Sequence, residues 1–275
     1  MAGFEVGVNT FSYTYSHAAL GCLLHLKTRG YRAFEILATA PHFWPPALDA
    51  TARREIPRRL REEGLRILSF NHPSLDHNLV SPMPEMRRYT VERFLEFIAL
   101  AGEWGVPWII VVPGKVSPLF PAPRAWLEAW FAEGMRTLAD AAGRAGVQLL
   151  VENVPTAWLP KAEDVAAALD NLAIPGIGVC YDVANAAFIG EDPAAGLKRL
   201  AARVRLVHLS DTGRDRWRHD PVGRGIVDFK AFAEALREIG YAGPSMLEII
   251  SPAPDADIAA SHRRLAALGW QAPAA

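Results

Sequence analysis

Four short apolar segments in the second half of the sequence decide its fold: residues 149–152 (LLVE), 178–182 (GVCYD), 205–209 (RLVHL) and 245–249 (SMLEI). Each segment is rich in branched apolar residues and carries a polar side chain at or near its end. Runs of this length and composition are typical of strands buried in a parallel sheet. Longer amphipathic stretches separate them, which predicts a repeated strand–helix unit.

The first half of the sequence continues this alternation. Its strand-like segments are residues 5–9 (EVGVN), 33–37 (AFEIL), 67–71 (ILSFN) and 108–112 (WIIVV). Apolar side chains recur at helical spacing over residues 84–104, and turns containing Gly105 and Gly146 stand where helices should end. Eight strands that begin about 27 to 41 residues apart, each followed by a helix, predict a (β/α)8 TIM barrel in α/β class, with a single domain over residues 1–275.

An open doubly wound sheet is the alternative fold for such alternation. That fold normally carries a glycine-rich phosphate-binding turn after its first strand. This sequence has NTFSY at residues 9–13 instead. The count of eight strands also favours closure into a barrel.

Charge is balanced over the 275 residues, with 29 Lys and Arg against 30 Asp and Glu and a formal net charge of −1. This balance removes the electrostatic basis for binding nucleic acid or an anionic membrane. The uncharged apolar run at residues 104–114 is too short to span a bilayer, and the N-terminus lacks the pattern of a signal peptide. The two cysteines, Cys22 and Cys180, lie far apart in the sequence. We therefore expect a cytoplasmic protein with reduced thiols.

Polar side chains stand at equivalent places near the ends of the four late segments. They are Glu152, Asp182, His208 and Glu248. Side-chain alternation lets all four point into a barrel at the carboxyl ends of its strands, the end at which barrel enzymes carry their active sites. The layer below them is expected to consist of Leu150, Cys180, Leu206 and Met246. Three carboxylates and an imidazole are costly to bury without a cation, and they suit Mn²⁺, Mg²⁺, Co²⁺ or Fe²⁺. The alternative is that each is an ordinary polar strand end, capped or solvated.

The segments around these four residues resemble the signatures of the xylose-isomerase-like TIM barrels. The similar stretches are residues 150–153 (LVEN), 180–182 (CYD), 207–211 (VHLSD) and 247–248 (LE). That superfamily contains sugar-phosphate isomerases and epimerases, inosose dehydratase, hydroxypyruvate isomerase and type IV apurinic endonucleases, and the spacing here is most similar to that of the ketose 3-epimerases. The resemblance implies one divalent metal ion, Mn²⁺ before Mg²⁺, Co²⁺ or Fe²⁺, held by Glu152, Asp182, His208 and Glu248. It also implies that Glu152 and Glu248 act as the acid/base pair.

Further positions bear on substrate binding. Arg214, six residues after His208, stands where those epimerases place a substrate-binding arginine. Two positions depart from the epimerase pattern, because Asn185 replaces a substrate-binding histidine and Trp158 replaces a glutamate. We expect Asn185 to bind substrate in place of that histidine. His72 follows the third strand and Glu35 stands in the second. We expect both to line the substrate site, with orientation of a neighbouring side chain as the alternative role of Glu35.

The endonuclease branch of the superfamily requires additional His and Asp ligands, among them an Asp-x-His pair after the seventh strand. The corresponding residues here are Trp217, Arg218 and His219, so only the histidine of that pair is present. Asn185 also replaces a histidine ligand of that branch. With a neutral chain, these replacements argue against action on DNA.

We therefore predict a metal-dependent sugar isomerase or epimerase that acts on a small polyhydroxylated carbonyl compound through an enediolate. Its partners would be this small molecule and, in a homo-oligomer, other copies of the chain, without nucleic acid or membrane. A metal-dependent dehydratase of the inosose dehydratase type is one alternative, because it begins with the same deprotonation. A non-catalytic sugar-binding barrel is the other.

Overall fold

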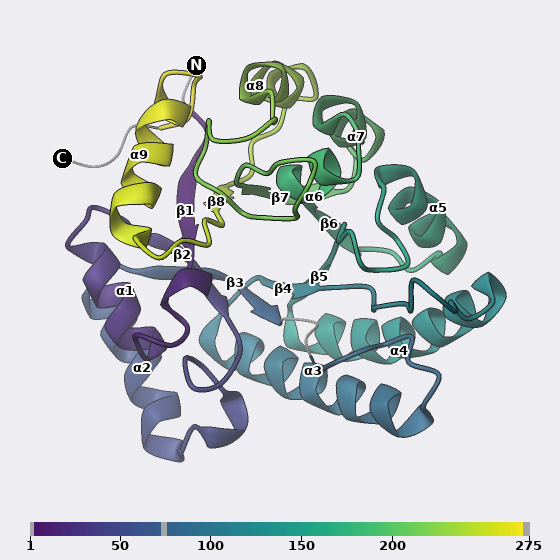
Figure 1. The fold of residues 1–275 in the computed structure, drawn as a ribbon. Helices are drawn as coiled ribbons and strands as arrows, with labels where there is room; N and C mark the ends of the chain where they lie inside the picture. Colours follow the sequence, from purple (N-terminus) through teal and green to yellow (C-terminus); the bar gives the residue numbers. More distant parts are fainter. Residues whose placement is uncertain (1–2, 73–75, 272–275) are drawn as a thin grey trace.

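Eight parallel strands close into a barrel in the order of the sequence, β1 to β8, in a computed structural model that describes residues 3–72 and 76–271 (Figure 1). The strands are β1 (Val6–Asn9), β2 (Ala33–Leu37), β3 (Arg66–His72), β4 (Trp108–Val111), β5 (Gln148–Glu152), β6 (Gly178–Asp182), β7 (Val204–Leu209) and β8 (Ser245–Leu247). The last strand pairs with the first, with Val6 opposite Ser245. The predicted (β/α)8 barrel is confirmed.

Helices surround the barrel as an outer ring (Figure 1). The α-helices are α1 (Ala19–Lys27), α2 (Ala50–Glu62), α3 (Pro84–Trp104), α4 (Arg124–Ala145), α5 (Ala162–Leu172), α6 (Val183–Phe188), α7 (Pro193–Arg199), α8 (Phe229–Glu238) and α9 (Pro254–Ala266). Two short 3₁₀ segments, η1 (Phe11–Tyr13) and η2 (Pro45–Ala47), follow β1 and β2. Within the described residues, no helix combines the length and the apolar character needed to cross a membrane.

Glycines end the two longest helices as the sequence predicts. Gly105 follows α3 and Gly146 follows α4, both in the left-handed region with φ of 69°. A residue with a Cβ atom is strained there, whereas glycine is not. At each of these glycines the chain turns directly into the next strand, so that β4 and β5 begin within a few residues of the preceding helix.

Beyond shifts of one residue at strand ends, the structure departs from the expected elements in two places. The single helix expected between β6 and β7 is divided into α6 and α7, because α6 ends before Gly190, which has positive φ, and Pro193 begins α7. The strand expected over residues 245–249 ends at Leu247. Glu248 is nevertheless held in register, since its backbone N–H donates to the carbonyl of Leu209 on β7 at 3.2 Å.

Two apolar layers follow from the alternation of side chains along each strand. The outward layer packs against the helices and includes Val151, Tyr181, Val207 and Leu247, as expected from the sequence. The inward layer consists of Ala33, Leu68, Ile110, Leu150, Cys180, Leu206 and Met246. Burying a side chain of the size of leucine contributes about 1.5–3 kcal/mol. This inward layer forms an apolar floor beneath the polar residues at the strand ends.

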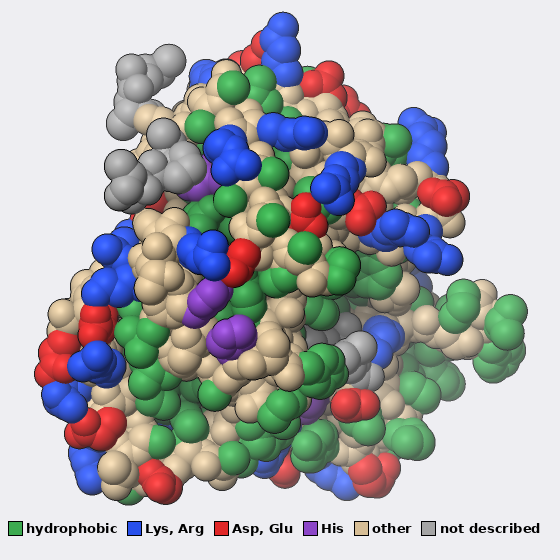
Figure 2. Space-filling view, turned by 60° about the vertical axis from the view of Figure 1, so that its left-hand side comes forward, with side chains coloured by type: hydrophobic (Ala, Val, Ile, Leu, Met, Phe, Trp, Pro, Cys, Tyr) green, Lys and Arg blue, Asp and Glu red, His purple; other side chains and the backbone are tan. Residues whose placement is uncertain are grey.

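Charged side chains of both signs intermingle on the face drawn in Figure 2, and Lys and Arg do not gather there into one continuous basic patch. A phosphate backbone requires such a patch or stripe. The distribution of charge on this face is thus in keeping with the balanced charge of the sequence.

Candidate metal centre

Four consecutive strands bring their terminal polar residues to one point inside the barrel. The residues are Glu152 on β5, Asp182 on β6, His208 on β7 and Glu248 directly after β8. One ligand atom from each residue lies within 4.8 Å of the ligand atoms of the other three. All four side chains are buried. Residues that are up to 96 positions apart in the sequence (152 and 248) therefore form one cluster that can hold a metal ion.

The imidazole of His208 lies at the middle of this cluster. Its Nδ1 atom is 3.0 Å from Oε1 of Glu152, 3.1 Å from Oε2 of Glu248 and 3.8 Å from Oδ2 of Asp182. Carboxylate oxygens and an imidazole nitrogen at such separations suit a hard or borderline divalent cation.

Three buried polar atoms of the cluster have no hydrogen-bond partner among residues 3–72 and 76–271. They are Oδ2 of Asp182, Oε2 of Glu248 and Nε2 of His208. Nε2 of His208 is only 2.9 Å from Oε1 of Glu35, but the two groups are not aligned for a hydrogen bond. An unpaired buried polar atom costs about 1–3 kcal/mol. A cation would give the carboxylate oxygens the partner that the protein lacks, so this donor set fits a divalent metal ion.

Burial and the charges of neighbouring groups both shift the pKa values of the cluster. Burial raises the pKa of Glu152, and it raises that of Asp182 to about 7. Burial alone would lower the pKa of His208, but the surrounding acidic groups, including Glu35 and Glu248, raise it well above its ordinary value. Burial would likewise raise the pKa of Glu248, yet the positive charges of His208 and His219 hold it well below its ordinary range.

Asp182 is fixed by the elements on either side of it. Its Oδ1 atom caps α6 by accepting from the backbone N–H of Asn185 at 2.6 Å. The side chain of Asn153 accepts from the backbone N–H of Asp182 at 2.8 Å and donates to its carbonyl at 3.0 Å. With Oδ1 used in this way, Oδ2 is left for the cluster.

His219 also lies at the cluster, which the sequence did not predict. Its Nδ1 atom is 3.3 Å from Oε2 of Glu248 and 3.0 Å from Oγ of Ser210. Burial lowers its pKa, but Glu248 and Asp182 outweigh burial and raise the pKa to about 9. The loop after β7 folds back because Asp211 and Asp220 exchange two backbone hydrogen bonds of 2.7 Å. The only sequence signal for His219 was its place in the incomplete Asp-x-His pair.

Glu35 lies wholly buried in the middle of β2, with Oε1 2.9 Å from Nε2 of His208. Its carboxylate accepts from Asn9 at 2.5 Å, from Ser69 at 2.5 Å and from Asn71 at 3.1 Å. Asn9 also donates to Oε1 of Glu248 at 3.0 Å, so a polar network joins Glu35 to the cluster. These contacts suit the alternative role of Glu35, which is to orient neighbouring side chains. A direct contact of Glu35 with substrate stays a prediction.

The other residues expected to bind substrate lie in different surroundings. Asn185 is buried, donates to the carbonyl of Asn153 at 2.9 Å and accepts from the indole N–H of Trp217 at 2.7 Å. His72 is buried against aromatic rings, with Phe94 at 4.8 Å between ring centroids, and burial lowers its pKa to about 3. Arg214 is exposed in the loop between β7 and α8. The structure does not bring these three side chains into the cluster, and their contact with substrate stays a prediction.

Comparisons with known proteins agree with this architecture. The family model described as "Xylose isomerase-like TIM barrel" matches residues 23–268. An L-ribulose-5-phosphate 3-epimerase, UlaE, of Salmonella paratyphi A is 27% identical over 121 residues, which are 44% of this chain and 43% of UlaE. The chain thus spans less than half the length of the curated relatives that it matches.

Solved structures share the fold over nearly the whole chain. A D-tagatose 3-epimerase-like protein has a TM-score of 0.83 at 20% identity, covering 96% of both chains. A D-psicose 3-epimerase of Clostridium cellulolyticum H10, solved with D-tagatose, has a TM-score of 0.77 at 17% identity and covers 92% of this chain and 89% of its own. At such identities these similarities concern the fold alone. Since the family model spans most of the sequence, the chain belongs to the xylose isomerase-like TIM barrel family.

Proposed function

We propose that the protein is a divalent-metal-dependent sugar isomerase or epimerase whose substrate is a small polyhydroxylated carbonyl compound. The observation that carries this proposal is the buried group of Glu152, Asp182, His208 and Glu248 at the carboxyl end of the barrel. The names of UlaE, an L-ribulose-5-phosphate 3-epimerase, and of the structurally similar D-psicose 3-epimerase support the choice of substrate class. The chemistry of the donor set favours Mn²⁺, with Mg²⁺, Co²⁺ and Fe²⁺ as substitutes.

In this proposal the two glutamates move the substrate proton. Glu152 and Glu248 approach the same ring nitrogen of His208 from β5 and from the end of β8, two strands that are separated by β6 and β7. One carboxylate removes a proton from the carbon next to the carbonyl group, and the other returns a proton. The bound cation supplies positive charge that stabilises the substrate oxygens during deprotonation.

The remaining residues of the cluster hold this arrangement. Asp182 and His208 complete the ligand set, and His219 fixes Glu248 from the side of the β7–α8 loop. Arg214, on the same loop, would donate paired hydrogen bonds to sugar hydroxyl groups or to a phosphate.

The reaction is tested with the purified protein, supplied with Mn²⁺, on a panel of ketoses, ketose phosphates and inososes in D₂O. Product NMR should show deuterium at the carbon next to the carbonyl group together with an isomerised or epimerised sugar. Loss of water would instead identify a dehydratase. Absence of both exchange and turnover over the whole panel would contradict the proposal and favour a barrel that only binds sugars. The matched control is Glu191→Gln, which alters a partly buried carboxylate that accepts from Tyr181 and from the backbone N–H of Ala162, outside the ligand set.

A further inference from the structure

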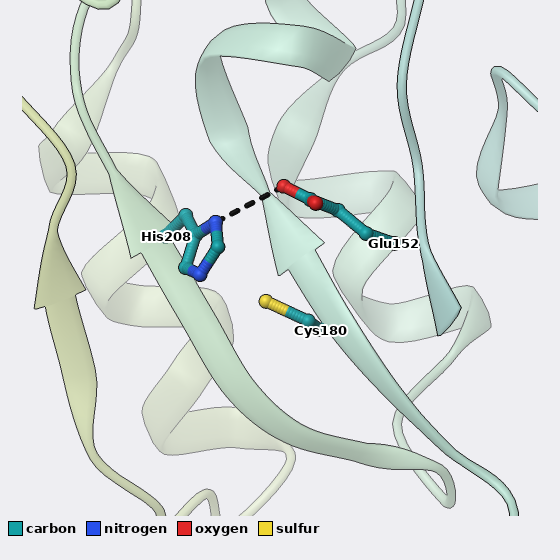
Figure 3. A group of neighbouring side chains, drawn as sticks. All are labelled: Glu152, Cys180 and His208. Carbon is teal, nitrogen blue, oxygen red and sulfur yellow. Dashed lines mark hydrogen bonds and ion pairs between the residues drawn. The ribbon is translucent and has the colours of Figure 1, made fainter. Parts of the chain in front are cut away.

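A thiol lies directly beneath the candidate metal centre. Cys180 precedes Asp182 by two residues on β6, so both side chains point into the barrel. The sulfur of Cys180 and ligand atoms of Glu152 and His208 lie within 4.8 Å of one another. Figure 3 shows these three side chains projecting from neighbouring strands into one space, with the thiol pointing toward the imidazole.

These three residues match the ligands of a different class of cation. Zn²⁺ binds thiolate sulfur at about 2.3 Å, imidazole nitrogen at about 2.0–2.1 Å and carboxylate oxygen at about 2.0–2.2 Å in tetrahedral geometry, which places the ligand atoms roughly 3.5 Å apart. The separation of 3.0 Å between His208 Nδ1 and Glu152 Oε1 is close to that value. His208 also has its second nitrogen, Nε2, buried without an aligned partner within the described chain.

We propose that Glu152, Cys180 and His208 form a second ligand set, which takes a thiophilic divalent cation such as Zn²⁺ or Cd²⁺. The cation displaces the thiol proton of Cys180 to water as the sulfur–metal bond forms. Glu152 and His208 belong to both sets, so a cation in the thiol-containing set excludes one held by Glu152, Asp182, His208 and Glu248. This inference rests on the proposed function in one respect: the proposed function identifies the cation that the thiophilic cation would displace.

The two ligand sets prefer different cations. Oxygen-rich sets suit Mn²⁺ and Mg²⁺, whereas thiolates select Zn²⁺ and related ions. Cys180 would therefore make the protein sensitive to thiophilic metals, which would inhibit it as long as they remain bound.

Titration of the metal-free, full-length protein with CdCl₂ tests the thiol-containing set directly. A thiolate bound to cadmium gives an ultraviolet charge-transfer absorption, which should saturate at one equivalent. Cys180→Ser should abolish this absorption, with Cys180→Ala as a second variant should the serine variant fail to melt cooperatively. Cys22→Ser is the matched control, because Cys22 is the other cysteine of the chain, is also buried and lies on α1. The cadmium absorption of Cys22→Ser should equal that of the unmodified protein.

A second pair of measurements separates this inference from the proposed function. Asp182 belongs to the four-residue set and not to the thiol-containing set. Asp182→Asn should lose at least tenfold in Mn²⁺ affinity, measured by the electron paramagnetic resonance signal of free Mn²⁺, and retain the cadmium absorption. Cys180→Ser should keep the Mn²⁺ affinity of the unmodified protein and lose the cadmium absorption.

Three results would overturn the inference: no absorption in the unmodified protein, absorption that persists in folded Cys180→Ser, or absorption that disappears in Asp182→Asn. Failure of Mn²⁺ to bind the unmodified protein, with the cadmium absorption intact, would instead contradict the proposed function alone.

Discussion

At the scale of single residues, the decisive pair is Glu152 and Glu248. If both act as acid/base groups, replacement of either by glutamine should lower turnover by about 10²–10⁴-fold, the usual effect of removing a general base. Glutamine still offers an oxygen to a cation but cannot accept a proton. Steady-state kinetics at saturating Mn²⁺ measure this loss. Full recovery of both variants with excess metal would mean that the glutamates are ligands and nothing more.

Glu35 carries a second prediction at this scale, concerning stability. Replacement of Glu35 by alanine leaves the buried donors of Asn9, Ser69 and Asn71 without their shared acceptor. The free energy of unfolding should fall by about 3–5 kcal/mol, the usual cost of removing one partner from a buried charged network. Urea denaturation measures the change.

The matched control for Glu35 is Glu62→Ala. Glu62 is exposed on α2 and pairs with Arg58 at the surface, so its loss should cost less than about 1 kcal/mol. Equal unfolding midpoints for the two variants would show that the network under the cluster does not stabilise the fold. A rise in KM for the more conservative Glu35→Gln, without loss of stability, would support the predicted contact with substrate.

At the scale of elements, the loop between β7 and α8 connects the cluster with the surface. Asp211 and Asp220 pair across it, and the indole of Trp217 is tied to Asn185. Together these contacts place His219 beside Glu248. The same contacts hold the loop that carries Arg214.

Arg214 on this loop should contribute to substrate binding and little to folding, because its side chain is exposed. Arg214→Ala should raise KM by about 10- to 100-fold, since a hydrogen bond from a charged donor contributes about 1.5–3 kcal/mol. The melting temperature should stay within a few degrees. Arg216→Ala, at an exposed position on the same loop, is the control and should leave KM unchanged. A variant of Arg214 that melts much earlier with normal kinetics would assign that residue to the fold instead.

Most elements of the barrel could be predicted from the sequence because parallel strands buried on both faces read as short apolar runs. The inward placement of Leu150, Cys180, Leu206 and Met246 was predictable for the same reason, as side chains alternate along a strand. The division into α6 and α7 was harder to foresee, since it depends on the local conformation at Gly190 and on Pro193.

Site residues at the ends of strands could be predicted from the sequence, whereas the site residue in a loop could not. The convergence of Glu152, Asp182, His208 and Glu248 follows from strand register, which hydrophobic patterning fixes. The position of His219 depends on backbone pairing within a loop, which has no periodic signal in the sequence. The partners of Glu35 and Asn185 were likewise unpredictable, because they come from strands and loops that meet only in the closed barrel.

At the scale of the whole molecule, metal binding should be coupled to folding. The cluster joins four neighbouring strands, β5 to β8, and an unfolded chain cannot assemble it. Ligand present at about 100 times its Kd stabilises a folded protein by about 2.7 kcal/mol. Mn²⁺ should therefore raise the melting temperature of the chelator-treated protein by several degrees, and a chelator should reverse the effect. An unchanged melting temperature would contradict this coupling.

The measurement that tests the metal centre most directly is the metal stoichiometry of the purified protein and its variants, determined after equilibration with Mn²⁺ and removal of the free ion. We expect one Mn²⁺ per chain in the unmodified protein and in Glu191→Gln. Asp182→Ala and His208→Ala should retain almost none while still melting cooperatively. Undiminished stoichiometry in both of these variants would contradict the assignment of Glu152, Asp182, His208 and Glu248 as the ligands.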